Sequence, residues 1–293
     1  MRLKRKGYRM IKPALQDGDF LADVAGARTR EDEFHLWWLG QSGFLLQWRG
    51  RHILFDPYLS DSLTRKYAGT DKPHVRMTER VIDPAKLDFI QVVTSSHNHT
   101  DHLDAETLKS LLRVNPELEL VVPEANRTFV ADRLQVVMEM PRGLDAGRRT
   151  RVGPFTIHAI PAAHENLDRD ENGRHKYLGY VVEFGPWTVY HSGDTVRYEG
   201  MVDWLRRWRI DVAFLPINGR VPDRRVAGNL TGVEAAQLSS EAGVRCVIPC
   251  HYDMFEFNTA PPEEFDAECR RLGQDCRILR SGERWSSDDM TRA

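Results

Sequence analysis

The run Ser-Ser-His-Asn-His-Thr-Asp-His-Leu-Asp, residues 95–104, carries three histidines and two aspartates within ten positions. It directly follows the apolar run at residues 89–94, which is typical of a buried strand. Asp104 then stands where an N-cap residue would begin a helix, and the leucines of residues 108–112 would share one helical face. This order of strand, ligand-rich loop and helix predicts an α/β fold with a metal site at the end of the strand.

A loop of histidines without a metal is the alternative interpretation. A single histidine at a strand end is usually a polar residue with a local partner. His97, His99 and His102 together are different, because packed imidazoles without a cation need other partners and repel one another at low pH. Asp101 adds a carboxylate to the same six positions. The density of ligand-type side chains therefore favours a metal site.

Three more candidate ligands stand at the ends of predicted strands. His164 follows the alternating run at residues 155–160, Asp194 follows an apolar run that ends in Ser-Gly, and His251 closes Val-Ile-Pro-Cys. Gly193 would allow a tight turn before Asp194. Each position alone is commonly occupied without a metal. Since α/β proteins build their sites in loops after strands, four such strand ends together predict one shared site.

With this ligand pattern the sequence resembles the metallo-β-lactamase-fold hydrolases, whose His-x-His-x-Asp-His motif matches residues 97–102. Within that superfamily it is most similar to the L-ascorbate-6-phosphate lactonases, through Trp-Leu-Gly-Gln-Ser-Gly-Phe at residues 38–44 and through residues 56–61, 215–220 and 251–258. The similarity extends over nearly the whole chain. It implies a first metal site of His97, His99 and His164, a second of Asp101, His102 and His251, a bridging ligand, Asp194, and Asp56 as the residue that organises the metal loops.

The resemblance implies an α/β fold of four layers, an αββα sandwich in which two mixed sheets face each other with helices outside. The order of predicted elements agrees with it, because strands come first as a meander and then alternate with helices. Thr231 with Glu234 predicts one helix start, and Gly243 its end. We expect one domain over residues 1–293, with an irregular lid or oligomer contact at residues 58–86 and a polar tail at residues 286–293 that frays.

The ligand set predicts metal-assisted hydrolysis. Three imidazoles leave one position open on a tetrahedral ion, which marks a catalytic metal. A water held between two cations loses a proton near neutral pH and becomes the nucleophile, and the cations take up the developing oxyanion charge. Asp194 would bridge the ions and Asp101 would return a proton to the leaving oxygen. We expect two divalent ions per chain, zinc or manganese with iron as a further option.

The residues expected to bind the substrate follow a different strand. Arg220 has the planar fork that suits a phosphate group, although an ion pair within the fold explains it equally well. Asn218, Asn229 and Tyr252 are neutral polar groups expected in the same cleft. His191, three residues before Asp194, is expected to be a hydrogen-bond partner of the metal ligands that does not itself contact the metal. The other histidines that we interpret as structural are His35, His52, His74 and His158.

Composition narrows the class of protein. The 293 residues have a formal net charge of −2 and are 41% hydrophobic, so the chain has no general attraction to nucleic acid and enough apolar material for a core. The basic residues 1–7 are not followed by the apolar region of a secretory signal. The four cysteines show no paired framework. We therefore expect a cytoplasmic homo-oligomer with no membrane or nucleic-acid partner.

Three functions compete for this sequence. The first is a lactonase that opens a phosphorylated sugar lactone, similar to L-ascorbate 6-phosphate lactone. The second is a phosphodiesterase of the same superfamily, and the third is a non-catalytic binding protein stabilised by metal. The filled ligand positions favour an enzyme, because a site that has decayed usually loses some of its ligands.

Overall fold

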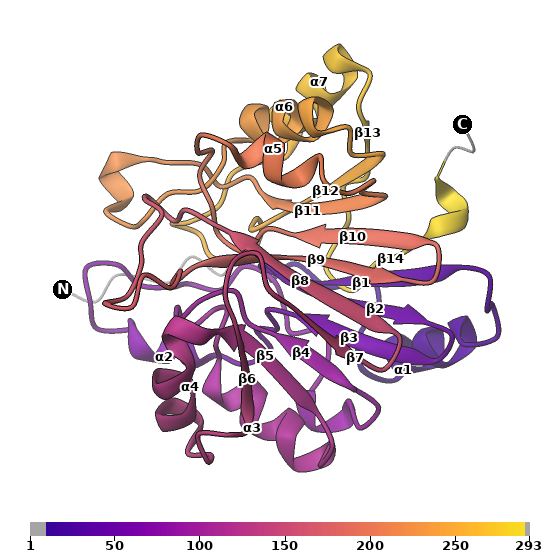
Figure 1. Cartoon of the computed structure of the whole chain (residues 1–293), viewed down its shortest axis with the longest axis vertical. Helices are drawn as coiled ribbons and strands as arrows, with labels where there is room; N and C mark the ends of the chain where they lie inside the picture. Colours follow the sequence, from indigo (N-terminus) through magenta and orange to yellow (C-terminus); the bar gives the residue numbers. More distant parts are fainter. Residues whose placement is uncertain (1–9, 291–293) are drawn as a thin grey trace.

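Two mixed sheets of seven strands each face one another in the computed structural model, which describes residues 10–290 (Figure 1). The first sheet has the order β14-β1-β2-β3-β4-β5-β6 and the second the order β13-β12-β11-β10-β9-β8-β7. The strands of the first sheet are β1 (Phe34–Gly40), β2 (Gly43–Trp48), β3 (Arg51–Phe55), β4 (Val92–Thr94), β5 (Glu119–Pro123), β6 (Pro141–Leu144) and β14 (Arg284–Ser286). Those of the second are β7 (Arg149–Val152), β8 (Phe155–Pro161), β9 (Leu178–Phe184), β10 (Trp187–His191), β11 (Val212–Pro216), β12 (Cys246–Cys250) and β13 (Asp275–Cys276).

Helices cover the outer face of each sheet, as Figure 1 shows. The first sheet carries α1 (Asp17–Ala27), α3 (Ala105–Val114) and α4 (Arg127–Leu134), and the second carries α5 (Met201–Leu205), α6 (Gly232–Ala242) and α7 (Glu263–Leu272). The short helix α2 (Ser62–Lys66) lies in the segment after β3, where Leu63 packs with Tyr58, Met254 and Phe255. Short 3-10 turns occur at Pro84–Lys86, Glu124–Asn126, Pro222–Arg224 and Ser287–Asp289. The predicted four-layer sandwich is confirmed.

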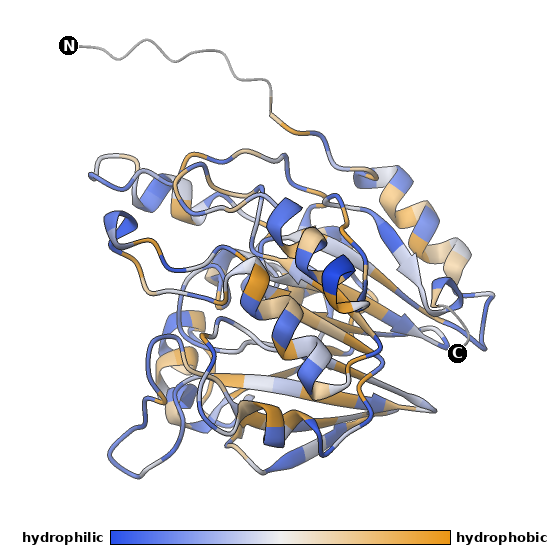
Figure 2. Cartoon of the chain, turned by 90° about the horizontal axis from the view of Figure 1, so that it is seen from above, coloured by the Kyte–Doolittle hydropathy of each residue, from blue (hydrophilic) through white to orange (hydrophobic). Residues whose placement is uncertain are grey.

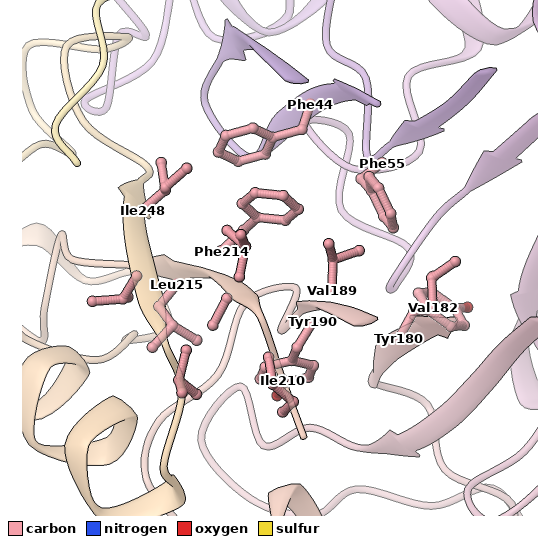
Figure 3. Packing of buried hydrophobic residues seen from close by; sticks show 14 of the residues in the cluster. Phe44, Phe55, Tyr180, Val182, Val189, Tyr190, Ile210, Phe214, Leu215 and Ile248 are labelled. Atoms are coloured by element: carbon pink, nitrogen blue, oxygen red, sulfur yellow. The ribbon is translucent and has the colours of Figure 1, made fainter. Parts of the chain in front are cut away.

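Side chains alternate along each strand, so one face of a sheet packs against the other sheet and the opposite face packs against the helices. In β1 and β2, Trp38 and Phe44 point into the core between the sheets, whereas Trp37 and Leu45 point outward to the helices. Phe44 stacks on Phe214 of β11 with ring centroids 4.2 Å apart, so the two sheets are in direct contact (Figure 3). Figure 2 shows the same segregation, with apolar residues gathered on the strands of the interior. The strands are therefore held in a fixed relative position, and so are the loops that follow them.

The helix boundaries that the sequence predicts are confirmed. Asp104 caps α3 by accepting a hydrogen bond from the Thr107 backbone N–H at 3.2 Å. Thr231 and Glu234 form a reciprocal capping box at the start of α6, and Gly243 ends that helix with a φ of 72°. These caps satisfy backbone N–H groups at the first turn that would otherwise lack partners. They therefore fix the residue at which each helix begins, directly after a loop of the candidate site.

The prediction of a frayed tail from residue 286 is wrong for residues 286–290, because these residues belong to the fold. Ser286 pairs with His35 in the register of β14 and β1, and Ser287 Oγ accepts a hydrogen bond from the Phe34 backbone N–H at 3.1 Å. Met290 is buried. The pairing of β14 with β1 closes the edge of the first sheet, which a polar sequence alone does not reveal. The basic residues 1–7 and residues 291–293 lie outside the described part of the chain.

The long segment at residues 58–86 is irregular apart from α2 and one 3-10 turn. Its backbone bonds to the loop after β12, through Met77 N to Met254 O and Glu256 N to Val75 O. The segment therefore packs against the end of the second sheet although it starts from the first. Within residues 10–290, no helix is long and apolar enough to cross a membrane.

Candidate metal centre

Five strands deliver the predicted ligands to one edge of the sandwich. Asp56 follows β3 and the run at residues 97–102 follows β4, both in the first sheet. His164 follows β8, Asp194 follows β10 and His251 follows β12, all in the second sheet. β3 and β4 are parallel, and in the second sheet β8 and β10 both pair antiparallel with β9, so these strands end at a common edge. The structure thus brings together all seven predicted metal ligands.

The ligands form two groups of three. The donor atoms of His97, His99 and His164 lie within 4.8 Å of one another, and so do those of Asp101, His102 and His251. In the first group the ring nitrogens His164 Nε2 and His99 Nδ1 are 3.1 Å apart. In the second, Asp101 Oδ2 is 3.6 Å from the Nε2 atoms of both histidines. These are the groupings that the resemblance implied.

Asp194 lies between the two groups. Its Oδ2 atom is 3.6 Å from His164 Nε2 of the first group and 3.4 Å from His251 Nε2 of the second. Its Oδ1 atom is 3.3 Å from His102 Nε2. A carboxylate in this position can contact a cation in either group, which is what a bridging ligand must do.

Unpaired buried atoms test whether a cation fits this arrangement. His97 Nε2, His102 Nε2 and Asp194 Oδ1 are buried and make no hydrogen bond of good geometry, although the last two atoms lie 3.3 Å apart as an ion pair. Buried polar atoms are nearly always paired, since an unpaired one costs roughly 1–3 kcal/mol. Three such atoms facing one another, two imidazole nitrogens and a carboxylate oxygen, are the donor types that divalent transition metals bind. The residues present therefore fit a metal centre.

Hydrogen bonds behind the ligands fix which ring nitrogen faces the centre. His102 Nδ1 donates to Asp56 Oδ2 at 2.6 Å, and Ser96 Oγ lies 3.0 Å from His97 Nδ1. His164 Nδ1 donates to the backbone oxygen of Gly228 at 3.1 Å. In these rings Nδ1 is engaged and Nε2 is the atom left for a metal, the usual arrangement for metal-binding histidines.

Asp56 itself is held by the loop that it organises. Its carboxylate accepts the Ser96 backbone N–H at 2.9 Å and the Ser96 hydroxyl. Gly193, before Asp194, has a φ of 61°, and a Cβ there would lie 2.4 Å from the Cβ of Ser96. Only glycine permits both this turn and this close approach. His191 contacts Ser42 O and the Gly193 backbone N–H rather than a ligand, so it supports the turn that carries Asp194.

Burial and charge divide the histidines into two kinds. Burial, together with the neighbouring rings, holds the pKa of His97 well below its usual value, so His97 is neutral and able to bind a metal at neutral pH. Burial also acts to lower the pKa of His251, but Asp194 and Asp101 outweigh it and raise this pKa to about 9. The pKa of Asp194 is held well below its usual value, because His102 and His251 outweigh its burial. His97 is thus ready for a cation, whereas His251 must release a proton to bind one.

A cleft of about 340 Å³ opens onto the ligands. Its walls beyond the ligands carry the cations Lys66, Lys72 and Arg133, together with aromatic groups. Ring contacts connect these walls, since His74 stacks on Tyr67 at 4.3 Å and also packs edge-on against Phe257 at 4.5 Å. Most of these residues come from the irregular segment at residues 58–86, which therefore forms one wall of the cleft. His74, which we interpreted as structural, lines this cleft while its Nδ1 atom lies 3.0 Å from the backbone oxygen of Lys72.

The four residues predicted to bind substrate lie elsewhere. Arg220 pairs with Glu234, the capping residue of α6, and donates to Asn229 O at 3.2 Å. Asn218 and Asn229 are buried and bond to each other, and Asn218 Nδ2 donates to Asn258 Oδ1 at 2.9 Å. Tyr252 is buried against Trp38 and donates to a backbone oxygen. None of these four lines the cleft, but Asn218 bonds directly to Asn258, which does.

One residue of the site was missed from the sequence. Gln41, in the turn after β1, is fully buried and its amide nitrogen donates to Asp101 Oδ2 at 2.8 Å. The sequence signal was available, because Gln41 lies in the motif at residues 38–44 that carries the family resemblance. The motif alone does not reveal the role of Gln41, because that role depends on the loop at residues 97–102 that its side chain contacts.

Comparison with known proteins agrees with this geometry. Residues 51–252 match the family described as the Beta-lactamase superfamily domain. A UPF0173 metal-dependent hydrolase from Rubrobacter xylanophilus is 30% identical over 258 residues, which cover 85% of this chain and 95% of that protein. Among solved structures, a metallo hydrolase from Ignicoccus hospitalis superposes with a TM-score of 0.63 at 20% identity, over 87% of this chain and 98% of that one. A metallo-β-lactamase fold protein from Bacillus subtilis superposes with a TM-score of 0.60 at 17% identity, over 87% of this chain and all (100%) of that one.

The facing sheets and the loops at their common edge define a metallo-β-lactamase fold. The chain belongs to the beta-lactamase superfamily and, within it, to the UPF0173 family of metal-dependent hydrolases.

Proposed function

We propose that this protein hydrolyses an ester bond in a small anionic molecule, a phosphorylated sugar lactone being the leading substrate, at a centre of two divalent cations. The observation that carries the proposal is the position of Asp194 between two groups of three ligands, with unpaired buried nitrogens on both sides. When bound, two cations of zinc, manganese or iron would polarise the carbonyl group of the substrate and acidify a water molecule.

The protein's own residues have three tasks in this reaction. Asp194, which lies between the two groups, would contribute a carboxylate oxygen to a cation in each. Asp101 is the more exposed of the two ligand carboxylates, 15% against 5% for Asp194, so we assign it the transfer of a proton to the leaving oxygen. His102 and His251 outweigh burial and hold the pKa of Asp101 below its usual value, so it would carry this proton only briefly. Tyr67 and Phe257 contribute aromatic surface to the wall of the cleft.

The charge of the cleft supports an anionic substrate. Lys66 is exposed beside the Tyr67 ring, and Lys72 donates to the backbone oxygen of Arg225 across the mouth. Both ammonium groups can turn toward a ligand, whereas Arg133 also braces the ligand loop through Asn98 O at 2.7 Å. A phosphate group would be attracted here rather than to Arg220, whose guanidinium already pairs with Glu234. The cleft volume suits a sugar-sized molecule.

The test is hydrolysis of matched substrates by the metal-reconstituted protein. The panel contains a sugar lactone with and without a phosphate group, and a phosphodiester for the rival activity. In the double variant Lys66→Ala, Lys72→Ala, the KM for the phosphorylated lactone should rise by about tenfold, with little change for the plain lactone. Arg65→Ala is the matched control, because Arg65 adjoins Lys66 but pairs with Glu106 outside the cleft.

Each outcome of this panel decides between functions. Turnover of the phosphodiester alone would replace the lactonase by the phosphodiesterase. Metal binding without turnover of any ester would support the binding protein. An equal rise in KM for both lactones in the double variant would remove the argument for an anionic substrate.

A further inference from the structure

The side chain of Gln41 occupies a position inside the second ligand group. Its amide nitrogen lies 2.8 Å from Asp101 Oδ2 and 2.9 Å from His251 Nε2. Those two atoms are themselves 3.6 Å apart. The amide nitrogen is therefore beside both atoms that would bind the second cation, at nearly equal distances.

The backbone of Gln41 is held in place by hydrogen bonds to its carbonyl oxygen. Gln41 has a φ of 51°, a left-handed conformation that is unfavourable for a residue other than glycine. Its carbonyl oxygen accepts from the His251 backbone N–H at 2.9 Å and from Trp38 Nε1 at 3.0 Å. The turn after β1 and the end of β12 are thus joined through one peptide group, and any movement of Gln41 would move ligand His251.

The other end of the carboxamide lacks a partner. Gln41 Oε1 is buried and accepts no hydrogen bond. An unpaired buried amide oxygen is unfavourable, and Trp38 and His251 use only the backbone oxygen of this residue. A flip of the carboxamide by half a turn would exchange Oε1 and Nε2. A cation between Asp101 and His251 would then be the missing partner of Oε1.

We propose that Gln41 is a residue of the second metal site. Without a cation its amide nitrogen donates to Asp101 and holds that carboxylate in place, and with one its oxygen would be a neutral ligand beside Asp101, His102 and His251. This inference rests on the two-cation centre proposed above. Carbonyl and carboxylate oxygens suit manganese better than the three imidazoles of the first site do, so Gln41 would also bias the second site toward a harder ion.

Titration of the metal-free protein with Co²⁺ tests this directly, because the visible absorption of Co²⁺ depends on its coordination number. The wild type should take up two ions. Gln41→Leu should weaken the second step by about tenfold or more, leave the first step unchanged, and give the second Co²⁺ the stronger absorption of a lower coordination number. Gln41→Glu should tighten the second step, since it adds a charged oxygen at the same place.

Gln47→Leu is the matched control. Gln47 is also a buried glutamine, on the neighbouring strand β2, but its amide lies 3.2 Å from His52 and away from the ligands. It should titrate as the wild type does. The proposal would be overturned if the second Co²⁺ bound Gln41→Leu with an affinity within threefold of the wild type. If the leucine variant does not fold, weaker binding of the second Co²⁺ by Gln41→Glu would overturn it instead. A wild type that binds a single Co²⁺ would overturn both this inference and the two-cation function, so the two failures are distinguishable.

Discussion

Replacing Asp56 by asparagine should weaken both metal sites at once, although Asp56 faces neither cation. Its Oδ2 atom accepts from His102 Nδ1 at 2.6 Å, which orients a ligand of the second site. The Ser96 hydroxyl donates to the same carboxylate oxygen and lies 3.0 Å from His97 Nδ1, which orients a ligand of the first site. Asparagine has the same size but replaces one acceptor oxygen by a donor, so it cannot accept from all these groups.

The expected magnitude follows from the role of such partners. Loss of a group behind a metal-bound histidine typically costs about 10–100-fold in metal affinity, or about 1.4–2.7 kcal/mol. Asp56→Asn should show a loss of this order for each ion. Ser96→Ala removes only the path to His97, because the direct bond from His102 to Asp56 remains. Its loss should be confined to the first site.

Competition with a chelator of known affinity measures both constants in one titration of each variant. Circular dichroism of the metal-free proteins checks that both variants fold. The reasoning would be refuted if Asp56→Asn kept both affinities within threefold of the wild type. Equal weakening of both ions by Ser96→Ala would refute the relay through Ser96 and leave Asp56 as a general support of the loop.

Three other perturbations have expected outcomes. Asp194→Asn should lower kcat by at least about 100-fold with little change in folding, and near-normal turnover by the variant would contradict the bridge. Burial and Arg28 lower the pKa of His52 to about 3, so this neutral ring stabilises the fold above pH 6.5 and its contribution is lost as pH falls toward 3. Between pH 6 and pH 4, His52→Gln should therefore flatten the fall of the unfolding free energy by about 1.4 kcal/mol per pH unit, as urea denaturation would measure. Chelation of metal present at 100 times its Kd should lower the unfolding free energy by about 2.7 kcal/mol, and an unchanged melting temperature would show that the folded chain binds no metal.

The fold and the ligands could be predicted because their signals are local. Each ligand follows a strand directly, and parallel strands within one sheet bring their ends to one edge, so strand order alone places His97 beside Asp56. Helix starts are equally local, since Asp104 and Thr231 bond to groups three residues ahead. The first helix, α1, was not predicted, because the moderate apolar content of residues 17–27 gives no clear face in the sequence.

The substrate side of the site could not be predicted for the opposite reason. Glu234 was identified as a capping residue and Arg220 as a phosphate ligand, each from its own neighbourhood. Their ion pair forms because the loop after β11 packs beside the start of α6, and this depends on the tertiary structure. The cations that line the cleft, Lys66 and Lys72, lie in a segment without periodicity, and only the folded chain shows what this segment covers.

Each group of ligands draws on both sheets, and this links the chemistry to the packing of the domain. The first group joins His97 and His99 of the first sheet to His164 of the second, and the second group joins Asp101 and His102 to His251 in the same way. Cations held there would cross-link two sheets that are otherwise joined by side-chain packing. Stabilisation by metal is therefore expected for an enzyme and for a metal-stabilised binding protein alike. Only the cleft separates these two functions, because a structural metal does not require an opening that ends at the ligands, and this one is lined by cations suited to an anionic substrate.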